Sequence, residues 1–157
     1  MNKINPCLWF DNQAEEAMNF YVATFKNSKL GAIARYGEAG PGAKGSVMTV
    51  TATLDGHEFM ALNGGPHFKI SPAISFMVNC GSQAEVDDMW AKLSAGGAEQ
   101  QCGWLTDKFG VSWQVVPTAF GEMMKSGTDE QRERAMKAVL TMIKLDIATL
   151  KAAFDGK

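Results

Sequence analysis

Hydrophobic and polar residues follow the same order in two successive parts of the chain. In the first part, a short apolar run at 6–10 predicts a buried strand, and helical spacing of apolar residues predicts a helix over 14–25. Alternating residues predict strands at 30–36, 46–54 and 57–63. The last two strands form a hairpin, because the Asp-Gly pair between them favours a tight turn.

The same order then begins again. A strand is predicted at 73–79, an apolar helical stripe runs from Val86 to Leu93, a weak strand follows at 98–105, and a final strand spans 111–116. Both helices begin with similar capping-box sequences, Asn12-Gln13-Ala14-Glu15 and Ser82-Gln83-Ala84-Glu85. The repeat indicates a duplicated module, in which each half is too small to bury its own sheet face.

After Pro117 the pattern becomes helical, with a helix at 119–125 and another start at Thr128. Apolar residues then recur at alternating spacings of four and three, which makes a seam for another helix or for a partner subunit: Met136, Leu140, Ile143, Ile147, Leu150 and Phe154. Either one helix continues, or Asp146 caps a separate last helix. The predicted organisation is one domain, 1–117, of two repeats (about 4–68 and 72–117), followed by a helical extension, 118–157.

Composition narrows the class of protein. The 157 residues are 46% hydrophobic and 20% charged, which is typical of a globular chain. The net charge of −2 and the absence of a basic run argue against nucleic acid as a partner. The sequence has no signal-peptide pattern and no apolar segment that could cross a membrane, and its three cysteines are odd in number and widely spread. We therefore expect a cytoplasmic protein.

Small hydroxyl or amide side chains recur opposite the apolar faces of the predicted strands: Asn63, Ser75, Asn79, Ser112 and Gln114. A sheet covered by helices on one side and curled around its other side would gather these groups in a cleft. The alternative is that the polar face simply meets water, as antiparallel sheets allow. His67 follows Gly64-Gly65-Pro66 and is either a binding residue near the mouth of this cleft or an ordinary surface histidine.

Other motifs carry less chemistry. The segment Gly40–Gly45 matches G-x-G-x-x-G, but a strand follows it, whereas the dinucleotide fingerprint needs a helix there. The segment is therefore interpreted as a loop. Cys102 has no base that the sequence places beside it, which favours a half-buried thiol over a nucleophile. The acidic pairs Glu15-Glu16 and Asp87-Asp88 fall in first helical turns, where they complement the helix dipole.

Several segments together resemble the PhnB-like family, often labelled demethylubiquinone methyltransferase-like, of the vicinal oxygen chelate superfamily, which is also called glyoxalase/bleomycin resistance/dioxygenase. These segments are Leu8–Asp11, Phe59–Phe68, Ile74–Asn79, Gln101–Leu105 and Gly110–Gln114. The resemblance implies an α+β fold of paired βαβββ modules that form a curled, mostly antiparallel sheet with a central cleft. It also implies a homodimer.

In the metalloenzymes of that superfamily, four strand positions hold a divalent metal, and by resemblance they fall at about Pro6, Ala61, Ala73 and Gln114. Pro and Ala offer no donor, and a neutral Gln is a poor replacement for Glu. We therefore expect no metal and no cofactor.

The leading interpretation is a small-molecule-binding protein, with the five polar strand residues lining the cleft and His67 near its mouth. One alternative is a lyase or isomerase that uses acid/base chemistry or a metal recruited through a partner subunit. Another is the methyltransferase of the family label, for which the glycine-rich loop provides no S-adenosylmethionine site.

Overall fold

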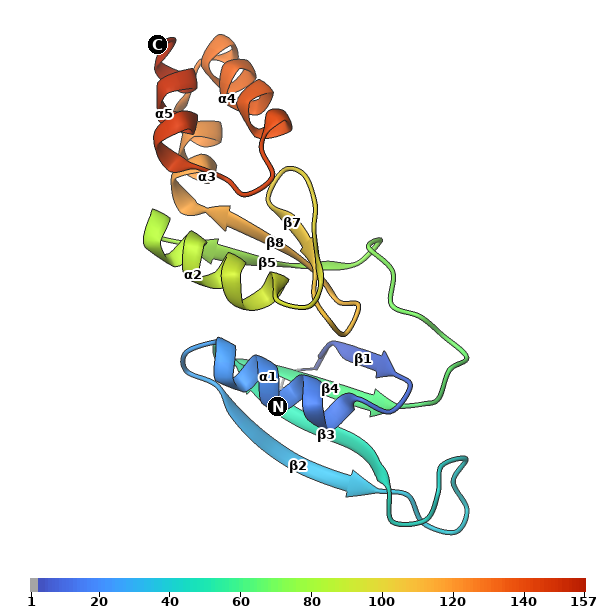
Figure 1. Ribbon diagram of the computed structural model, residues 1–157. Helices are drawn as coiled ribbons and strands as arrows, with labels where there is room; N and C mark the ends of the chain where they lie inside the picture. The colour runs from blue at the N-terminus through green and yellow to red at the C-terminus, as the bar shows by residue number, and fades with distance from the viewer. Residues whose placement is uncertain (1–2) are drawn as a thin grey trace. The chain divides into compact units, whose positions relative to one another are not determined.

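The computed structural model describes residues 3–157 and divides the chain into two compact units, Met1–Ile70 and Ser71–Lys157 (Figure 1). The first unit is a βαβββ module of β1 (Cys7–Phe10), α1 (Ala14–Thr24), β2 (Lys29–Arg35), β3 (Val47–Leu54) and β4 (His57–Asn63). The second unit repeats it with β5 (Ser75–Cys80), α2 (Gln83–Ser94), β6 (Ala98–Glu99), β7 (Trp104–Thr106) and β8 (Ser112–Pro117). Three helices follow, α3 (Thr118–Ser126), α4 (Asp129–Thr141) and α5 (Ile147–Asp155).

Both modules build a four-stranded sheet with the same strand order. The first sheet runs β1-β4-β3-β2 and the second β5-β8-β7-β6, and in each the first and last strands of the module pair in parallel while the other pairs are antiparallel. The α+β class and the duplicated βαβββ module are therefore confirmed. The single weak strand predicted at 98–105 is wrong. It is two short strands, because Cys102 and Gly103 adopt positive φ values of 63° and 80° and turn the chain back.

Helix α1 lies across one face of the first sheet (Figure 1). Its apolar stripe is fully buried, and so are the strand residues of that face: Ala14, Ala17, Met18 and Tyr21 on the helix, with Val50 and Ala61 on the strands. The capping box predicted at Asn12 and Glu15 is wrong. The N-cap residue is Gln13, which makes no side-chain cap, and Asn63 of β4 instead accepts a hydrogen bond from the Ala14 N–H at 2.8 Å.

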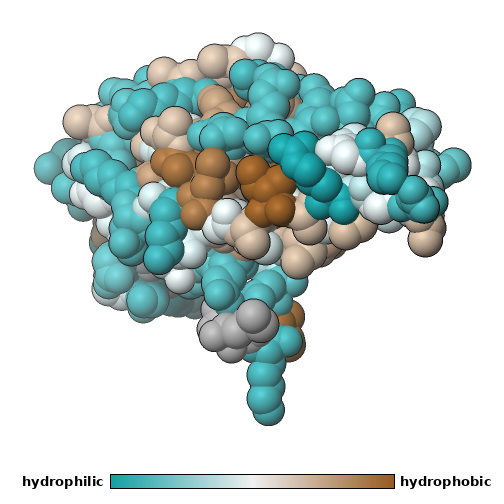
Figure 2. Space-filling view, turned by 90° about the horizontal axis from the view of Figure 1, so that it is seen from below, coloured by the Kyte–Doolittle hydropathy of each residue, from teal (hydrophilic) through white to brown (hydrophobic). Residues whose placement is uncertain are grey.

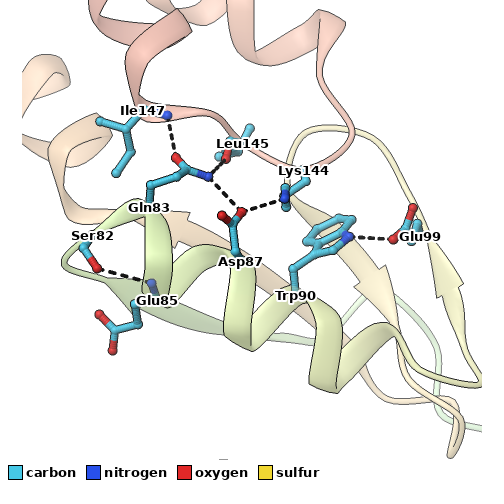
Figure 3. Close-up of polar contacts among 9 residues, drawn as sticks. All are labelled: Ser82, Gln83, Glu85, Asp87, Trp90, Glu99, Lys144, Leu145 and Ile147. Carbon is cyan, nitrogen blue, oxygen red and sulfur yellow. Dashed lines mark hydrogen bonds and ion pairs between the residues drawn. The ribbon is translucent and has the colours of Figure 1, made fainter.

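Helix α2 covers one face of the second sheet with its buried stripe Val86, Met89, Trp90 and Leu93. The predicted capping box is half formed. Ser82 accepts a hydrogen bond from the Glu85 N–H, while the Glu85 carboxylate accepts from the Gly81 N–H, one residue earlier than a capping box requires (Figure 3). Trp90 donates its indole N–H to Glu99 at 2.7 Å, which ties α2 to β6.

The predicted turn Asp107–Gly110 is confirmed and is held by one buried carboxylate. Asp107 Oδ1 accepts hydrogen bonds from the N–H groups of Phe109 and Val111 at 2.9 and 3.0 Å, and Oδ2 accepts from the Trp113 indole at 2.8 Å. Gly110 completes the turn with a φ of 87°. A single side chain therefore joins the turn to the α2-covered face of β8.

The C-terminal segment contains two helices after Thr128, not one, because Asp146 caps α5 by accepting from the Thr149 N–H. The link Met142–Asp146, called the strap below, is fastened to α2. Gln83 donates to the Leu145 carbonyl and accepts from the Ile147 N–H, as a β-strand backbone would, and Asp87 pairs with Lys144 at 2.6 Å (Figure 3).

The residues of the predicted hydrophobic seam, which now lie on α4, the strap and α5, are only partly buried. Leu150 joins a buried cluster with Met123, Val139 and Leu145, whereas Met136, Leu140 and Ile143 stay exposed. Figure 2 shows a face of the molecule on which hydrophobic side chains gather in a patch within mostly hydrophilic surroundings. None of the helices in residues 3–157 has both the length and the hydrophobicity needed to cross a bilayer.

Candidate functional site

A pocket of about 450 Å³ opens in the first module. Three chain segments line it: residues 11–15 at the beginning of α1, parts of the loop between β2 and β3, and residues 63–67 after β4. Two of the predicted binding residues, Asn63 and His67, are among the lining residues. Sequence positions far apart in the module therefore converge on one hollow.

Asn63 holds the walls of this pocket together. Its Oδ1 accepts from the Ala14 N–H, its Nδ2 donates to the Val47 carbonyl at 3.1 Å, and its own carbonyl accepts from the Tyr36 hydroxyl at 2.6 Å. Asn63 lies in register with Phe10 on the face that α1 covers, not on the helix-free face where strand parity had placed it. Its role in the pocket is thus structural support, because both atoms of its amide are engaged within the module.

The loop between β2 and β3 is folded around Tyr36. The Tyr36 N–H donates to the Ser46 carbonyl and the Gly45 N–H returns a bond to the Tyr36 carbonyl, which closes the loop at its base. A Cβ atom added at Gly40 or Gly42 would lie 2.4 or 2.3 Å from ring atoms of Tyr36. The first two glycines of the G-x-G-x-x-G match thus leave room for an aromatic ring, and β3 follows the match, which confirms the interpretation as a loop.

The segment after β4 is supported by Trp9. The Trp9 indole N–H donates to the Gly65 carbonyl at 2.9 Å, and a Cβ atom added at Gly64 would lie 2.2 Å from the Trp9 ring. Phe68 packs edge-on against the same ring, with centroids 5.0 Å apart. The exposed His67 therefore extends from a segment that is fixed on both sides.

The charged side chains at the pocket are Asp11 and Glu15, which belong to the beginning of α1. Glu15 was expected only to cap the helix and to complement its dipole, and Asp11 and Tyr36 were not predicted as site residues. The only available signal was their position directly after β1 or after β2, since loops that follow strands often carry binding residues. The convergence of these segments depends on two strand pairings. The Asp-Gly turn predicted the β3–β4 pairing, whereas no local pattern encodes the parallel β1–β4 pairing.

The other predicted residues lie in the second module. Ser75 and Ser112 are in register across β5 and β8, on the face opposite the buried Trp113 and Val115. Gln114, on that same face, donates to the Ser75 hydroxyl at 2.9 Å. Asn79 is exposed at the far end of the same strand face. On the side that α2 does not cover, the sheet therefore offers the polar groups of Ser75, Gln114 and Asn79, with the exposed Met77 between Ser75 and Asn79, while Ser112 is buried.

The positions that the resemblance assigns to a metal do not suit one. Ala61 is fully buried on the α1-covered face, Pro6 and Ala73 have no side-chain donor, and the neutral Gln114 amide is bonded to a serine. Within residues 3–157, no three His, Cys, Asp or Glu side chains lie close enough together to hold a metal ion. Divalent metals that catalyse reactions are normally bound by imidazole and carboxylate groups, which this donor set lacks.

Cys102 has a structural environment. Its N–H donates to the Met142 carbonyl at 2.8 Å, and its half-buried side chain packs against the apolar cluster of the C-terminal helices. These contacts join the turn between β6 and β7 to the strap. They account for the residue without nucleophilic chemistry.

Comparison with known proteins gives consistent matches over the two modules. A family model described as 3-demethylubiquinone-9 3-methyltransferase matches residues 2–116. The solved structure of a PhnB protein from Bacillus cereus, itself described as a 3-demethylubiquinone-9 3-methyltransferase, is 41% identical with a TM-score of 0.68, and the match covers 74% of this chain and 99% of that one. Protein PA1353 from Pseudomonas aeruginosa is 26% identical with a TM-score of 0.62, over 74% of this chain and 98% of that one. No curated protein matches the chain. Helices α3 to α5 lie beyond the residues that the family model matches.

Proposed function

The chain belongs to the PhnB-like family described as 3-demethylubiquinone-9 3-methyltransferase, and we propose that it binds a small organic molecule in the pocket of its first module. The observation that supports this proposal is the meeting of Asn63 and His67 at one hollow of about 450 Å³. Small-molecule sites are concave, are formed before the ligand arrives, and contain a few fixed polar groups. A site of that size accommodates a metabolite rather than a macromolecule.

The walls of the pocket are rigid for identifiable reasons. Asn63 ties β4 to α1 and β3, Tyr36 fills the loop, and Trp9 supports the segment that carries His67. A preorganised site loses little conformational entropy when a ligand binds, so even a modest contact area gives useful affinity. We assign direct ligand contact to His67 and support of the site to Asn63.

The proposal extends to the helix-free face of the second sheet. There Asn79 and the hydrogen-bonded pair of Ser75 and Gln114 supply hydroxyl and amide groups that suit a neutral polar ligand, whereas Ser112 is buried and supports the sheet. We also propose, from the family resemblance, a homodimer in the cytoplasm. Size-exclusion chromatography with light scattering tests the dimer, and a monomeric mass at micromolar concentration would exclude it.

Binding is a better account of these residues than methyl transfer. Methyl transfer from S-adenosylmethionine usually needs a glycine-rich turn between a strand and a helix. Here the glycine-rich loop surrounds Tyr36 and leads into β3. The lyase or isomerase alternative has no observation of its own in its favour, because the donor set does not suit a metal and Cys102 packs against the C-terminal helices.

A thermal-shift screen with a metabolite library tests the proposal. A ligand at a hundred times its dissociation constant adds about 2.7 kcal/mol to the free energy of unfolding, which shifts the melting temperature measurably. We expect His67→Ala to remove the shift. His57→Ala is the matched control, because His57 is also exposed but does not line the pocket. The proposal fails if no compound shifts the melting temperature, or if both histidine variants respond to the ligand as the wild type does.

A further inference from the structure

The ionisable side chains that line the pocket of the first module have a one-sided charge. They are the carboxyl groups of Asp11 and Glu15, the imidazole of His67 and the phenol of Tyr36, and no Lys or Arg is among the lining residues. A surface concavity lined by one sign of charge concentrates ligands of the opposite sign. The lining therefore favours a cation over an anion.

The beginning of α1 lies at the same pocket, and a helix N-terminus would by itself favour an anion through its free N–H groups and its dipole. Here that preference is offset. The Ala14 N–H already donates to Asn63, and the first turn carries two acidic residues, Glu15 and Glu16. An anion at this end of the helix would meet carboxylates where a typical anion site offers N–H donors.

Backbone donors around the pocket are also used within the module. The Gly64 N–H donates to the Phe10 carbonyl, and the Gly65 N–H donates to the Asp11 carbonyl. The side chains of the lining at the side of α1 are the Asp11 and Glu15 carboxylates, which only accept hydrogen bonds, and the Asn12 amide, which both donates and accepts. The carboxylates that make this side of the pocket negative therefore also make it rich in acceptors, which suits a ligand that donates hydrogen bonds.

We propose that the ligand of this pocket carries a positively charged amine, whose N–H groups donate hydrogen bonds to the carboxylates of Asp11 and Glu15. The inference rests on the proposed function, since it names the ligand class of that same site. His67 and the loop around Tyr36 then contact the remainder of the molecule.

The test uses pairs of probes that share a carbon skeleton and differ in charge, such as 2-phenylethylamine and 3-phenylpropionate, with aliphatic pairs beside them. Binding to the full chain is measured by saturation-transfer NMR. We expect the amines to bind and their matched carboxylates not to bind. Because exposed charge pairs contribute up to about 1 kcal/mol each, Asp11→Asn combined with Glu15→Gln should weaken amine binding by about tenfold. Glu16→Gln, a change of charge on the same turn outside the pocket lining, should leave amine binding unchanged.

The outcomes separate the ligand class from the proposed function. The class is overturned if carboxylates bind in preference to amines, or if Glu16→Gln weakens amine binding as much as the double variant does. If the metabolite screen yields an anion whose binding requires His67 but not His57, the amine inference is wrong and the binding function stands. If no amine and no library compound binds at the pocket, both are wrong. Circular dichroism melting curves of each variant establish that a loss of binding does not reflect unfolding.

Discussion

The buried carboxylate of Asp107 should be among the most sensitive positions of the second module. Asp107 and Trp113 are each only 3% exposed, and the carboxylate accepts three hydrogen bonds from the turn and from the indole. A hydrogen bond to a charged group contributes about 1.5–3 kcal/mol, and a buried donor left without a partner costs about 1–3 kcal/mol. Asp107→Ala removes both acceptor oxygens and all three hydrogen bonds at once, so we expect the free energy of unfolding to fall by about 4 kcal/mol.

The conservative variant Asp107→Asn separates the turn from the indole. One oxygen of Asn can keep the two backbone bonds, but its amide N–H₂ would face the indole N–H, donor against donor, so we expect a loss of about 2–3 kcal/mol. In a Trp113→Phe background that conflict is absent, and Asp107→Asn should cost at least about 1 kcal/mol less. Urea denaturation followed by far-ultraviolet circular dichroism gives all four free energies of the cycle.

Urea denaturation of an Asp88→Asn variant provides the control. Asp88→Asn breaks only an exposed pair with Lys92 and should change the free energy of unfolding by less than about 0.5 kcal/mol. If Asp107→Asn costs as little as this control, or costs the same with Phe as with Trp at position 113, the carboxylate does not hold the turn and β8 together as described.

Three further predictions concern other parts of the chain. Gly42→Ala places a Cβ atom against the Tyr36 ring and should lower the free energy of unfolding by about 1–3 kcal/mol. The Cβ atom of Gly37→Ala, in the same loop, meets open space, so this variant should change the free energy of unfolding by less than about 0.5 kcal/mol. Equal effects of the two variants in urea denaturation would contradict the loop structure. Burial raises the pKa of the Cys80 thiol to about 11, so Cys80→Ser should leave the number of thiols that react quickly with Ellman's reagent at pH 8 unchanged. Contacts with Lys144 of the strap and Gln83 of α2 lower the pKa of the Asp87 carboxyl below its ordinary value, so its stabilising effect is present above the pKa of the unfolded state and is lost as pH falls through the lower folded value. The fall in melting temperature below about pH 4 should therefore be smaller in Asp87→Asn than in the wild type. An identical acid profile of the two proteins would contradict this assignment.

The division of the C-terminal segment shows why the helical pattern alone was ambiguous. The spacing of apolar residues from Met136 to Phe154 suits one continuous helix as well as two, because the same spacing can continue across a short non-helical link. The break is decided by contacts from elsewhere in the second unit. Gln83 replaces the backbone partners that Leu145 and Ile147 would have within a helix, and Asp146 then caps the second helix.

For the candidate site, too, the sequence predicted some features and left others open. Strand parity identified polar residues but not the face on which they lie. Asn63, the last residue of β4, shares the α1-covered face with the buried Ala61, because alternate residues of a strand share a face. There its amide oxygen accepts from the Ala14 N–H, at a helix start that the Gln13 side chain does not cap. The acidic side of the pocket was overlooked because the helix dipole is a sufficient local explanation for Glu15, and because nothing in the local sequence around Asp11 indicates a site.

The order of residues along the chain was enough to establish the two repeated modules, their α+β class, the turn at Asp107 and the loop character of Gly40–Gly45, since each depends on short-range periodicity or on turn chemistry that neighbouring residues set. Only the tertiary structure decided which segments converge on the pocket, which face Asn63 takes, and where the last helix begins. The physical reason is that these features follow from pairings between residues far apart in the chain, such as β1 with β4 and α2 with the strap, and their energies are absent from any local pattern.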